Sequence, residues 1–142
     1  MTGVGRLRAA SPYLLAGLLA GAGAAHFVAT DSFVRIIPSA FPQSTQRPLV
    51  QLSGVAELAC ATLIALPRTR RFGAVAAAIL LVAVFPANVK MATDGGIPGA
   101  GFPMGSPVVA WLRLPVQLPL IAWALSVARG RPVGPRTDRR IV

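Results

Sequence analysis

Apolar and polar positions divide the chain into four long apolar stretches joined by shorter polar connections. The stretches cover residues 12–30, 49–66, 72–92 and 107–128. Each has about 18 to 22 residues, which at about 1.5 Å per residue is enough to cross a hydrocarbon core of roughly 30 Å. The second stretch is the weakest because it contains Glu57. The pattern predicts an all-α membrane protein, with residues 1–128 forming a bundle of four transmembrane helices.

Most basic residues lie on one side of the predicted bundle. Ten arginines precede the first stretch, follow the second or follow the fourth: Arg6, Arg8, Arg68, Arg70, Arg71, Arg129, Arg131, Arg136, Arg139 and Arg140. The other side has only Arg35, Arg47 and Lys90. Because cytoplasmic connections are enriched in Lys and Arg, both termini are expected in the cytoplasm of a multi-pass cell-membrane protein. Residues 129–142 are then a basic, disordered cytoplasmic tail.

Composition supports the bilayer as solvent and narrows the chemistry. Hydrophobic residues make up 54% of the chain and charged residues only 13%, against roughly a quarter charged in soluble domains. The net charge of +10 does not indicate nucleic-acid binding, since the arginines flank apolar segments. Cys60 is the single cysteine and His26 the single histidine. No disulfide within the chain and no metal site are expected.

The N-terminal stretch could be mistaken for a signal peptide because a basic start precedes an apolar run and the small residues GAGAA. The apolar run continues through Phe27 and Val28, so we expect it to remain as the first span. Small residues suggest where helices approach closely. They are Gly17, Gly21 and Ala24 in the first stretch, and Ala74, Ala77 and Ala78 in the third.

The two connections on the less basic side differ from each other. Residues 31–48 contain Phe33, Ile36, Ile37 and Phe41, which should pack against the bundle or the membrane interface rather than face water. A short amphipathic helix is expected here, capped by Asp31 or Ser32. Residues 94–106 are rich in Gly and Pro and should be irregular and mobile.

Polar residues inside the spans are the candidate site, because each is costly in hydrocarbon. His26, Glu57, Asn88, Arg113 and Gln117 all fall in the predicted outer half, about 3 to 15 Å below the outer boundary. Glu57 and Arg113 are expected to form a direct or water-bridged ion pair, with His26, Asn88 or Gln117 completing the hydrogen bonds. The alternative is a cluster that serves packing alone.

Two other features of the spans bear on this site. Lys90 lies near the outer end of the third span and is expected to reach the outer headgroups. Pro86 removes one helical hydrogen bond, which leaves the carbonyl of Val82 free. Pro115 and Pro119 act in the same way in the fourth span. Interrupted helices of this kind provide backbone acceptors beside a cavity.

Five motifs together resemble the DoxX-like family of small bacterial membrane proteins. They are GAGAAHF at 21–27, IIPSAFP at 36–42, SGVAEL at 53–58, FPANVKMA at 85–92 and LRLPVQLPLIAWA at 112–124. The resemblance covers about residues 12–128 and implies four membrane helices with cytoplasmic termini. The motif positions that it carries over are His26, Pro38, Pro42, Gly54, Glu57, Pro86, Asn88, Lys90, Arg113 and Gln117.

Two classes of function remain open. The DoxX-like resemblance implies an accessory or quinone-interacting subunit of a membrane redox system, with a polar pocket in the outer half of the bundle and a redox protein as partner. The alternative is a non-catalytic membrane scaffold or partner-docking protein. Transport is a weaker candidate because four helices without inverted repeats give little machinery for alternating access. Enzymatic activity, the ligand beyond a possible quinone, and the oligomeric state are left open by the residues.

Overall fold

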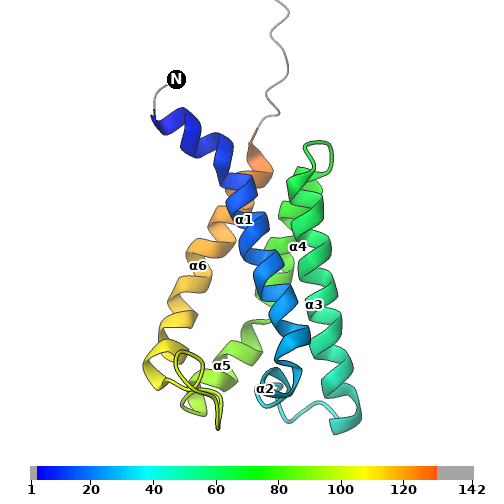
Figure 1. Cartoon of the computed structure of the whole chain (residues 1–142), viewed down its shortest axis with the longest axis vertical. Coiled ribbons are helices and arrows are strands. Elements are labelled where there is room, and N and C mark those ends of the chain that lie inside the picture. Colours follow the sequence, from blue (N-terminus) through cyan, green and yellow to red (C-terminus); the bar gives the residue numbers. More distant parts are fainter. Residues whose placement is uncertain (1–2, 131–142) are drawn as a thin grey trace, which may run out of the picture.

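The computed structural model describes residues 3–130 and shows helices joined by short connections (Figure 1). The helices are α1 (Gly3–Val28), α2 (Thr30–Val34), α3 (Gln43–Ala65), α4 (Arg70–Ala83), α5 (Phe85–Thr93) and α6 (Pro107–Arg129). No strand occurs between residues 3 and 130. The predicted all-α class is therefore confirmed. The predicted tail lies almost entirely in residues 131–142, outside the described residues.

Four segments are long and apolar enough to cross a membrane: Ala9–Val28, Gln43–Ala65, Arg70–Thr93 and Pro107–Arg129. The start of α1, the 66–69 turn and the end of α6 lie at one end of the bundle, here named the terminal end (Figure 1). The connections 29–42 and 94–106 lie at the opposite end, the loop end (Figure 1). The helices therefore alternate in direction as the four predicted spans require.

The third span is interrupted rather than continuous. Helix α4 ends at Ala83, and α5 begins at Phe85. Pro86 stands at the start of α5, where its missing N–H and its ring prevent the α4 hydrogen-bond ladder from continuing. The span predicted over 72–92 thus consists of two helices with a joint at Val84. Helix α3 also begins at Gln43 rather than at residue 49, because polar residues extend it beyond its apolar stretch.

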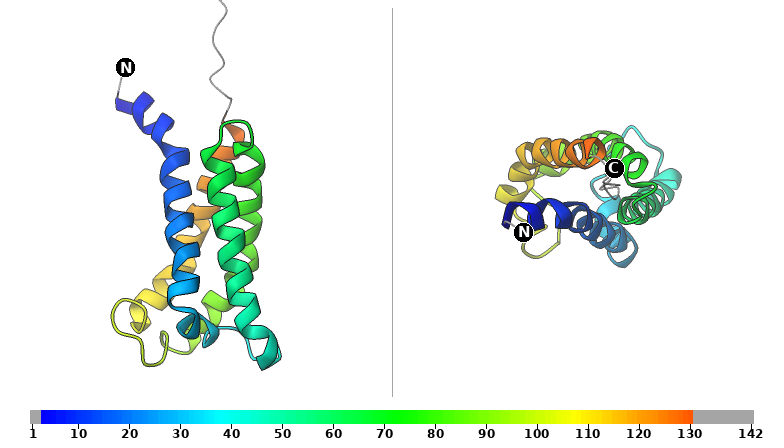
Figure 2. Two further views of the ribbon diagram at one scale, coloured as in Figure 1. Left: turned by 45° about the vertical axis from the view of Figure 1, so that its right-hand side comes forward. Right: turned by 90° about the horizontal axis from the view of Figure 1, so that it is seen from above.

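Helix packing follows a ring in the order α1, α3, α4 and α6 (Figure 2). Helices α1 and α3, α3 and α4, and α4 and α6 pack extensively, whereas α1 meets α6 over only a short length. At the terminal end, Trp123 Nε1 donates to Ser11 Oγ at 2.8 Å and joins α6 to α1. Helices α3 and α6 are therefore diagonal in this ring and are not neighbours.

Two separate hydrophobic clusters form the core. The terminal-end core joins α1, α3, α4 and α6 through Leu15, Ala16, Leu19, Cys60, Ala61, Ile64, Ala74, Ala77, Ala78, Ala124, Val127 and Ala128. The loop-end core contains Phe33, Ile36, Val50, Met91, Ala92, Ile97 and Ala110. Many large apolar side chains outside these cores are exposed, as expected when lipid surrounds the bundle.

The small-residue predictions are correct for α4 but wrong for α1. Ala74, Ala77 and Ala78 are buried in the terminal-end core. In α1, by contrast, a Cβ added at Gly17 or Gly21 would meet nothing within 4 Å. The buried glycine of α1 is Gly23, because the inward face of α1 runs through Leu15, Leu19 and Gly23 at four-residue intervals.

The first loop-end connection packs largely as predicted. Phe33 and Ile36 are buried, Ile37 is partly buried and packs against the loop-end core, and Phe41 remains 46% exposed. The short helix is α2, but its predicted cap is wrong. Its N-cap residue is Ala29, with no side-chain hydrogen bond at the cap. Asp31 instead pairs with Arg47 at 2.5 Å.

The second connection, residues 94–106, is irregular as predicted. Gly95, Gly96 and Gly99 adopt positive φ values, which glycine tolerates without steric cost. Ile97 is 1% exposed and enters the loop-end core. Arg35 Nη1 donates to the carbonyl of Pro98 and joins the two connections. The connection thus contributes to the core instead of extending wholly into solvent.

Candidate functional site

Six buried or half-buried polar residues of the four spans lie in a layer between the two cores. On α3, Glu57 stands seven residues from Val50 of the loop-end core and seven from Ile64 of the terminal-end core. On α6, Gln117 stands midway between Ala110 and Ala124 in the same way. Seven residues make about two helical turns, so these positions share one inward face. We name this set the polar layer: His26, Ser53, Glu57, Asn88, Arg113 and Gln117.

His26 and Glu57 meet between α1 and α3. His26 Nδ1 lies 3.4 Å from Glu57 Oε2 and 2.9 Å from the carbonyl oxygen of Ala22. The two side chains are 14% and 10% exposed. A proton on Nδ1 has the helical carbonyl as its closer acceptor, and Nε2 is then the ring's acceptor atom when the imidazole is neutral.

Close approach of α1 and α3 brings this pair together. A Cβ on Gly23 would lie 2.9 Å from the carbonyl oxygen of Gly54. A Cβ on Gly54 would lie 2.9 Å from both His26 Cβ and Phe27 Cε2. Neither position therefore has room for a larger residue. On its ring face His26 stacks on Phe33, with centroids 4.2 Å apart and planes 16° from parallel.

Two buried oxygen atoms in the polar layer have no hydrogen-bond partner among residues 3–130. They are Glu57 Oε2 and Ser53 Oγ, one helical turn apart on α3. Glu57 as a whole is only 8% exposed. The 3.4 Å contact with His26 is a charge contact rather than a well-formed hydrogen bond. A buried carboxylate oxygen without a donor costs free energy, so it marks a place where a donor from outside the chain would be stabilising.

Asn88 and Gln117 form the second part of the layer, between α5 and α6. Asn88 Nδ2 donates to Gln117 Oε1 at 2.7 Å, and Gln117 Nε2 donates to the carbonyl of Leu81. Gln117 is 2% exposed. Its amide thus satisfies a carbonyl next to the joint at Val84. The sequence predicted a free backbone carbonyl at Val82. The carbonyl that accepts a side-chain hydrogen bond, from Gln117, is that of Leu81.

Arg113 does not form the predicted direct ion pair with Glu57. No ion pair between them is found among the described residues, and Arg113 Nη1 instead lies 3.8 Å from Met104 Sδ. The reason is the ring order, in which α3 and α6 are diagonal while α3 adjoins α1, so that His26 reaches Glu57 first.

Depth was also predicted only in part. His26, Asn88 and Arg113 lie in the loop-end half of their spans, whereas Glu57 and Gln117 lie near the middle of α3 and α6. The extension of α3 to Gln43 accounts for the difference at Glu57.

Two surface hollows lie away from the polar layer and are lined by other residues. Phe33 and the Gly23–Gly54 contact were missed, because nothing in the sequence ties them to His26.

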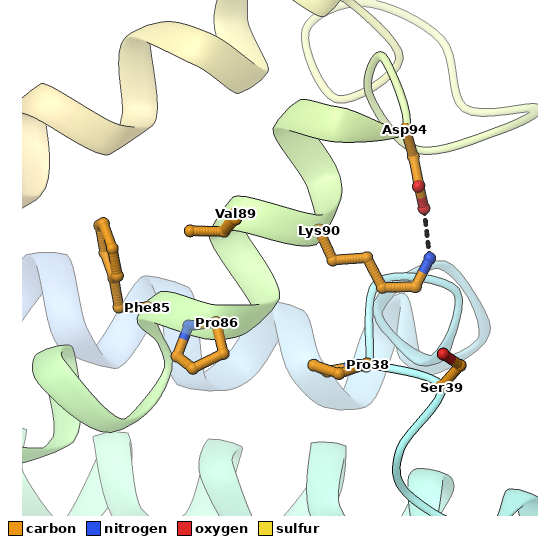
Figure 3. Close-up of a pocket in the computed structure, with 7 residues that line it drawn as sticks. All are labelled: Pro38, Ser39, Phe85, Pro86, Val89, Lys90 and Asp94. Atoms are coloured by element: carbon orange, nitrogen blue, oxygen red, sulfur yellow. Dashed lines mark hydrogen bonds and ion pairs between the residues drawn. The ribbon is translucent and has the colours of Figure 1, made fainter.

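One hollow of about 600 Å³ lies beside α5 at the loop end (Figure 3). Its lining comprises Pro38, Ser39, Phe85, Pro86, Val89, Lys90 and Asp94, and we name it the α5 hollow. Lys90 Nζ donates to Asp94 Oδ2 at its rim. Lys90 was expected to reach lipid headgroups, and in the structure its ammonium has this carboxylate as a partner.

Within residues 3–130, no three His, Cys, Asp or Glu side chains lie close enough together to bind a metal ion. Cys60 is buried in the terminal-end core. The polar layer itself offers hydrogen-bonding groups and charge, including the imidazole of His26 and the carboxylate of Glu57.

Comparison with known proteins gives a family without an assigned activity. Residues 15–128 match the family described as a domain of unknown function, DUF8561. Searches of curated proteins and of solved structures return no match. The DoxX-like resemblance is not addressed by this match and stays a prediction. The matched residues run from the inward face of α1 to the last turn of α6 and include the whole polar layer, and the chain belongs to the DUF8561 family.

Proposed function

We propose that this protein is a DoxX-like multi-pass protein of the cell membrane that binds a quinone at its polar layer, as an accessory subunit of a membrane redox system. The observation that carries the proposal is the Glu57 carboxylate, which is 8% exposed and leaves Oε2 without a hydrogen-bond donor. His26 lies beside it at 3.4 Å. A small amphiphile from the bilayer that offers a hydroxyl, such as the reduced form of a quinone, supplies this missing donor.

The donor set suits both redox forms of such a ligand. A quinone supplies two-electron redox chemistry when bound, coupled to proton exchange. The carboxylate of Glu57 accepts a hydrogen bond from a hydroxyl, and its protonated form donates one to a carbonyl oxygen. Ser53 Oγ can donate or accept in the same place. Arg113, another member of the polar layer, is a half-buried side chain with N–H donors.

A titration with quinones tests this proposal. Short-chain benzoquinone and naphthoquinone analogues are added to the protein in detergent, and binding is followed by calorimetry. We expect saturable binding, and Glu57→Gln should weaken it about tenfold, because one charge-assisted hydrogen bond contributes on the order of 1.4 kcal/mol. The matched control is Asp31→Asn, since Asp31 is an exposed acid outside the polar layer. Absence of binding, or equal loss in both variants, would contradict the proposal.

A membrane scaffold is the second candidate, and one observation favours it. Asn88 and Gln117 satisfy each other and the Leu81 carbonyl without any ligand. This half of the polar layer can therefore be purely structural. If folded protein binds neither quinone class, the scaffold candidate is favoured over the binding candidate.

Membrane orientation belongs to the same proposal. Because cytoplasmic connections are enriched in Lys and Arg, we infer from the arginines of the sequence that both termini face the cytoplasm. Reporter fusions after Ala40 and Ala100 should therefore read as external, and fusions after Thr69 and Pro135 as cytoplasmic. The two pairs serve as controls for each other, because one orientation gives opposite signals. A cytoplasmic signal after Ala100 would reverse the assignment.

A further inference from the structure

The α5 hollow has an apolar part and a charged part (Figure 3). Phe85, Pro86 and Val89 line one side from α5, and Pro38 faces them from the first loop-end connection. Lys90, Asp94 and Ser39 lie at the other side. The hollow therefore combines an apolar surface with a charged rim, and these two parts match an amphiphilic molecule.

The order of these parts follows the third span toward the loop end. Helix α5 is the final part of the third span, which ends at Thr93, and Asp94 is its C-cap residue. Phe85 lies at the opposite end of α5, deeper in the span. Phe85 and Val89 are 39% and 38% exposed, so apolar surface is available to an acyl chain. The charged rim then stands at headgroup level.

The charges at the rim come as a balanced pair. The Lys90 and Asp94 side chains form an ion pair and remain 28% and 34% exposed. An ammonium offers three donors and a carboxylate only acceptors, so each keeps capacity for a further partner. The Ser39 hydroxyl lies on the same side of the hollow (Figure 3) and can donate or accept a hydrogen bond. A ligand that carries both a phosphate and an ammonium group can use all three side chains.

We propose that the α5 hollow is a binding site for a phospholipid with an ethanolamine headgroup. Its phosphate accepts hydrogen bonds from Lys90 and Ser39, its primary ammonium donates to Asp94, and one acyl chain follows Phe85 and Val89. A choline headgroup has no N–H to donate to the carboxylate. An anionic glycerol headgroup gives Asp94 no cation and adds a negative charge beside it.

Native mass spectrometry of the full chain in detergent tests the assignment. Phosphatidylethanolamine, phosphatidylcholine and phosphatidylglycerol with identical acyl chains are titrated separately. We expect the ethanolamine lipid to bind about tenfold more tightly than the other two. Asp94→Ala should remove its advantage over the choline lipid, because no side-chain oxygen then remains at position 94 to accept a hydrogen bond from the primary ammonium. Lys90→Gln should weaken all three lipids, since each has a phosphate.

The chain offers a matched control at the same end. Arg47 and Asp31 form an ion pair that is more exposed and lies outside the hollow. Arg47→Gln should leave the preference for the ethanolamine lipid unchanged. Circular dichroism of each variant establishes that the helices are retained. Equal affinity for the three lipids, tighter binding of the glycerol lipid, or the same loss in the Arg47 variant as in the Lys90 variant would overturn the proposal.

Discussion

Replacing Gly54 by alanine is expected to lower the free energy of unfolding by about 2 kcal/mol, and by leucine by about 3 kcal/mol or more. A Cβ at this position would lie 2.9 Å from His26 Cβ and 3.0 Å from the carbonyl oxygen of Gly23. Relief requires α1 and α3 to separate along their longest shared contact. Titration of the micelle-embedded protein with SDS, followed by circular dichroism, measures the change.

The control for this prediction is the same substitution on the open face of α1. A Cβ on Gly21 meets nothing within 4 Å. Gly21→Ala should therefore leave the free energy of unfolding unchanged or raise it by up to about 1 kcal/mol, since alanine is the better helix former. Equal stabilities of Gly54→Ala and Gly21→Ala would show that the two helices do not approach as closely as the structure indicates.

Replacing Gln117 by leucine is expected to lower the free energy of unfolding by about 2 kcal/mol. Gln117 is 2% exposed, accepts from Asn88 Nδ2 and donates to the carbonyl of Leu81. Leucine at position 117 leaves the side-chain amide of Asn88 and the carbonyl of Leu81 without these partners inside a membrane span. The same SDS titration gives the magnitude, and Gln51→Leu provides the control because Gln51 is exposed on α3.

A double-mutant cycle separates the Asn88–Gln117 interaction from the effect on the Leu81 carbonyl. If the amide pair is a unit, Asn88→Leu combined with Gln117→Leu should cost less than the sum of the single changes, by about 0.5 to 2 kcal/mol. Additive effects would instead mean that Gln117 acts only through the backbone of α4. Membrane hydrogen bonds average below 1 kcal/mol, so this cycle also shows whether the polar layer is stronger than usual.

The spans could be predicted from the sequence because hydropathy over about 20 residues responds directly to the bilayer. The joint at Val84 required only the chemistry of Pro86. Partner choice within the site could not be derived in this way. Depth placed Glu57 near Arg113, but depth does not give the order of helices around the ring, and that order puts α1 beside α3. His26 therefore contacts Glu57 at 3.4 Å, and Arg113 does not pair with it.

The glycine contacts could not be predicted from the sequence for the same reason, because they depend on which helices are neighbours. Gly17, Gly21 and Gly23 are all plausible contact residues by type, but Gly17 and Gly21 lie on the open face of α1 and Gly23 lies on its inward face. Only the identity of the inward face selects Gly23, and that face depends on contacts with Gly54 that are remote in sequence. The loop at 94–106 is similar, because its composition indicated irregularity but not that Ile97 would be buried in the core.

The separation of the two cores has a consequence for biosynthesis. Helices α1 and α3 emerge from the ribosome early and are adjacent in the ring. The loop-end core, however, needs Ile97 and Ala110, which are made after two thirds of the chain. Until Ala110 has entered the bilayer, Phe33, Val50 and Met91 lack part of their final packing partners. During that interval the nascent bundle exposes its loop-end half to lipid or to an insertion chaperone, and a pause in translation before α6 would prolong the exposure.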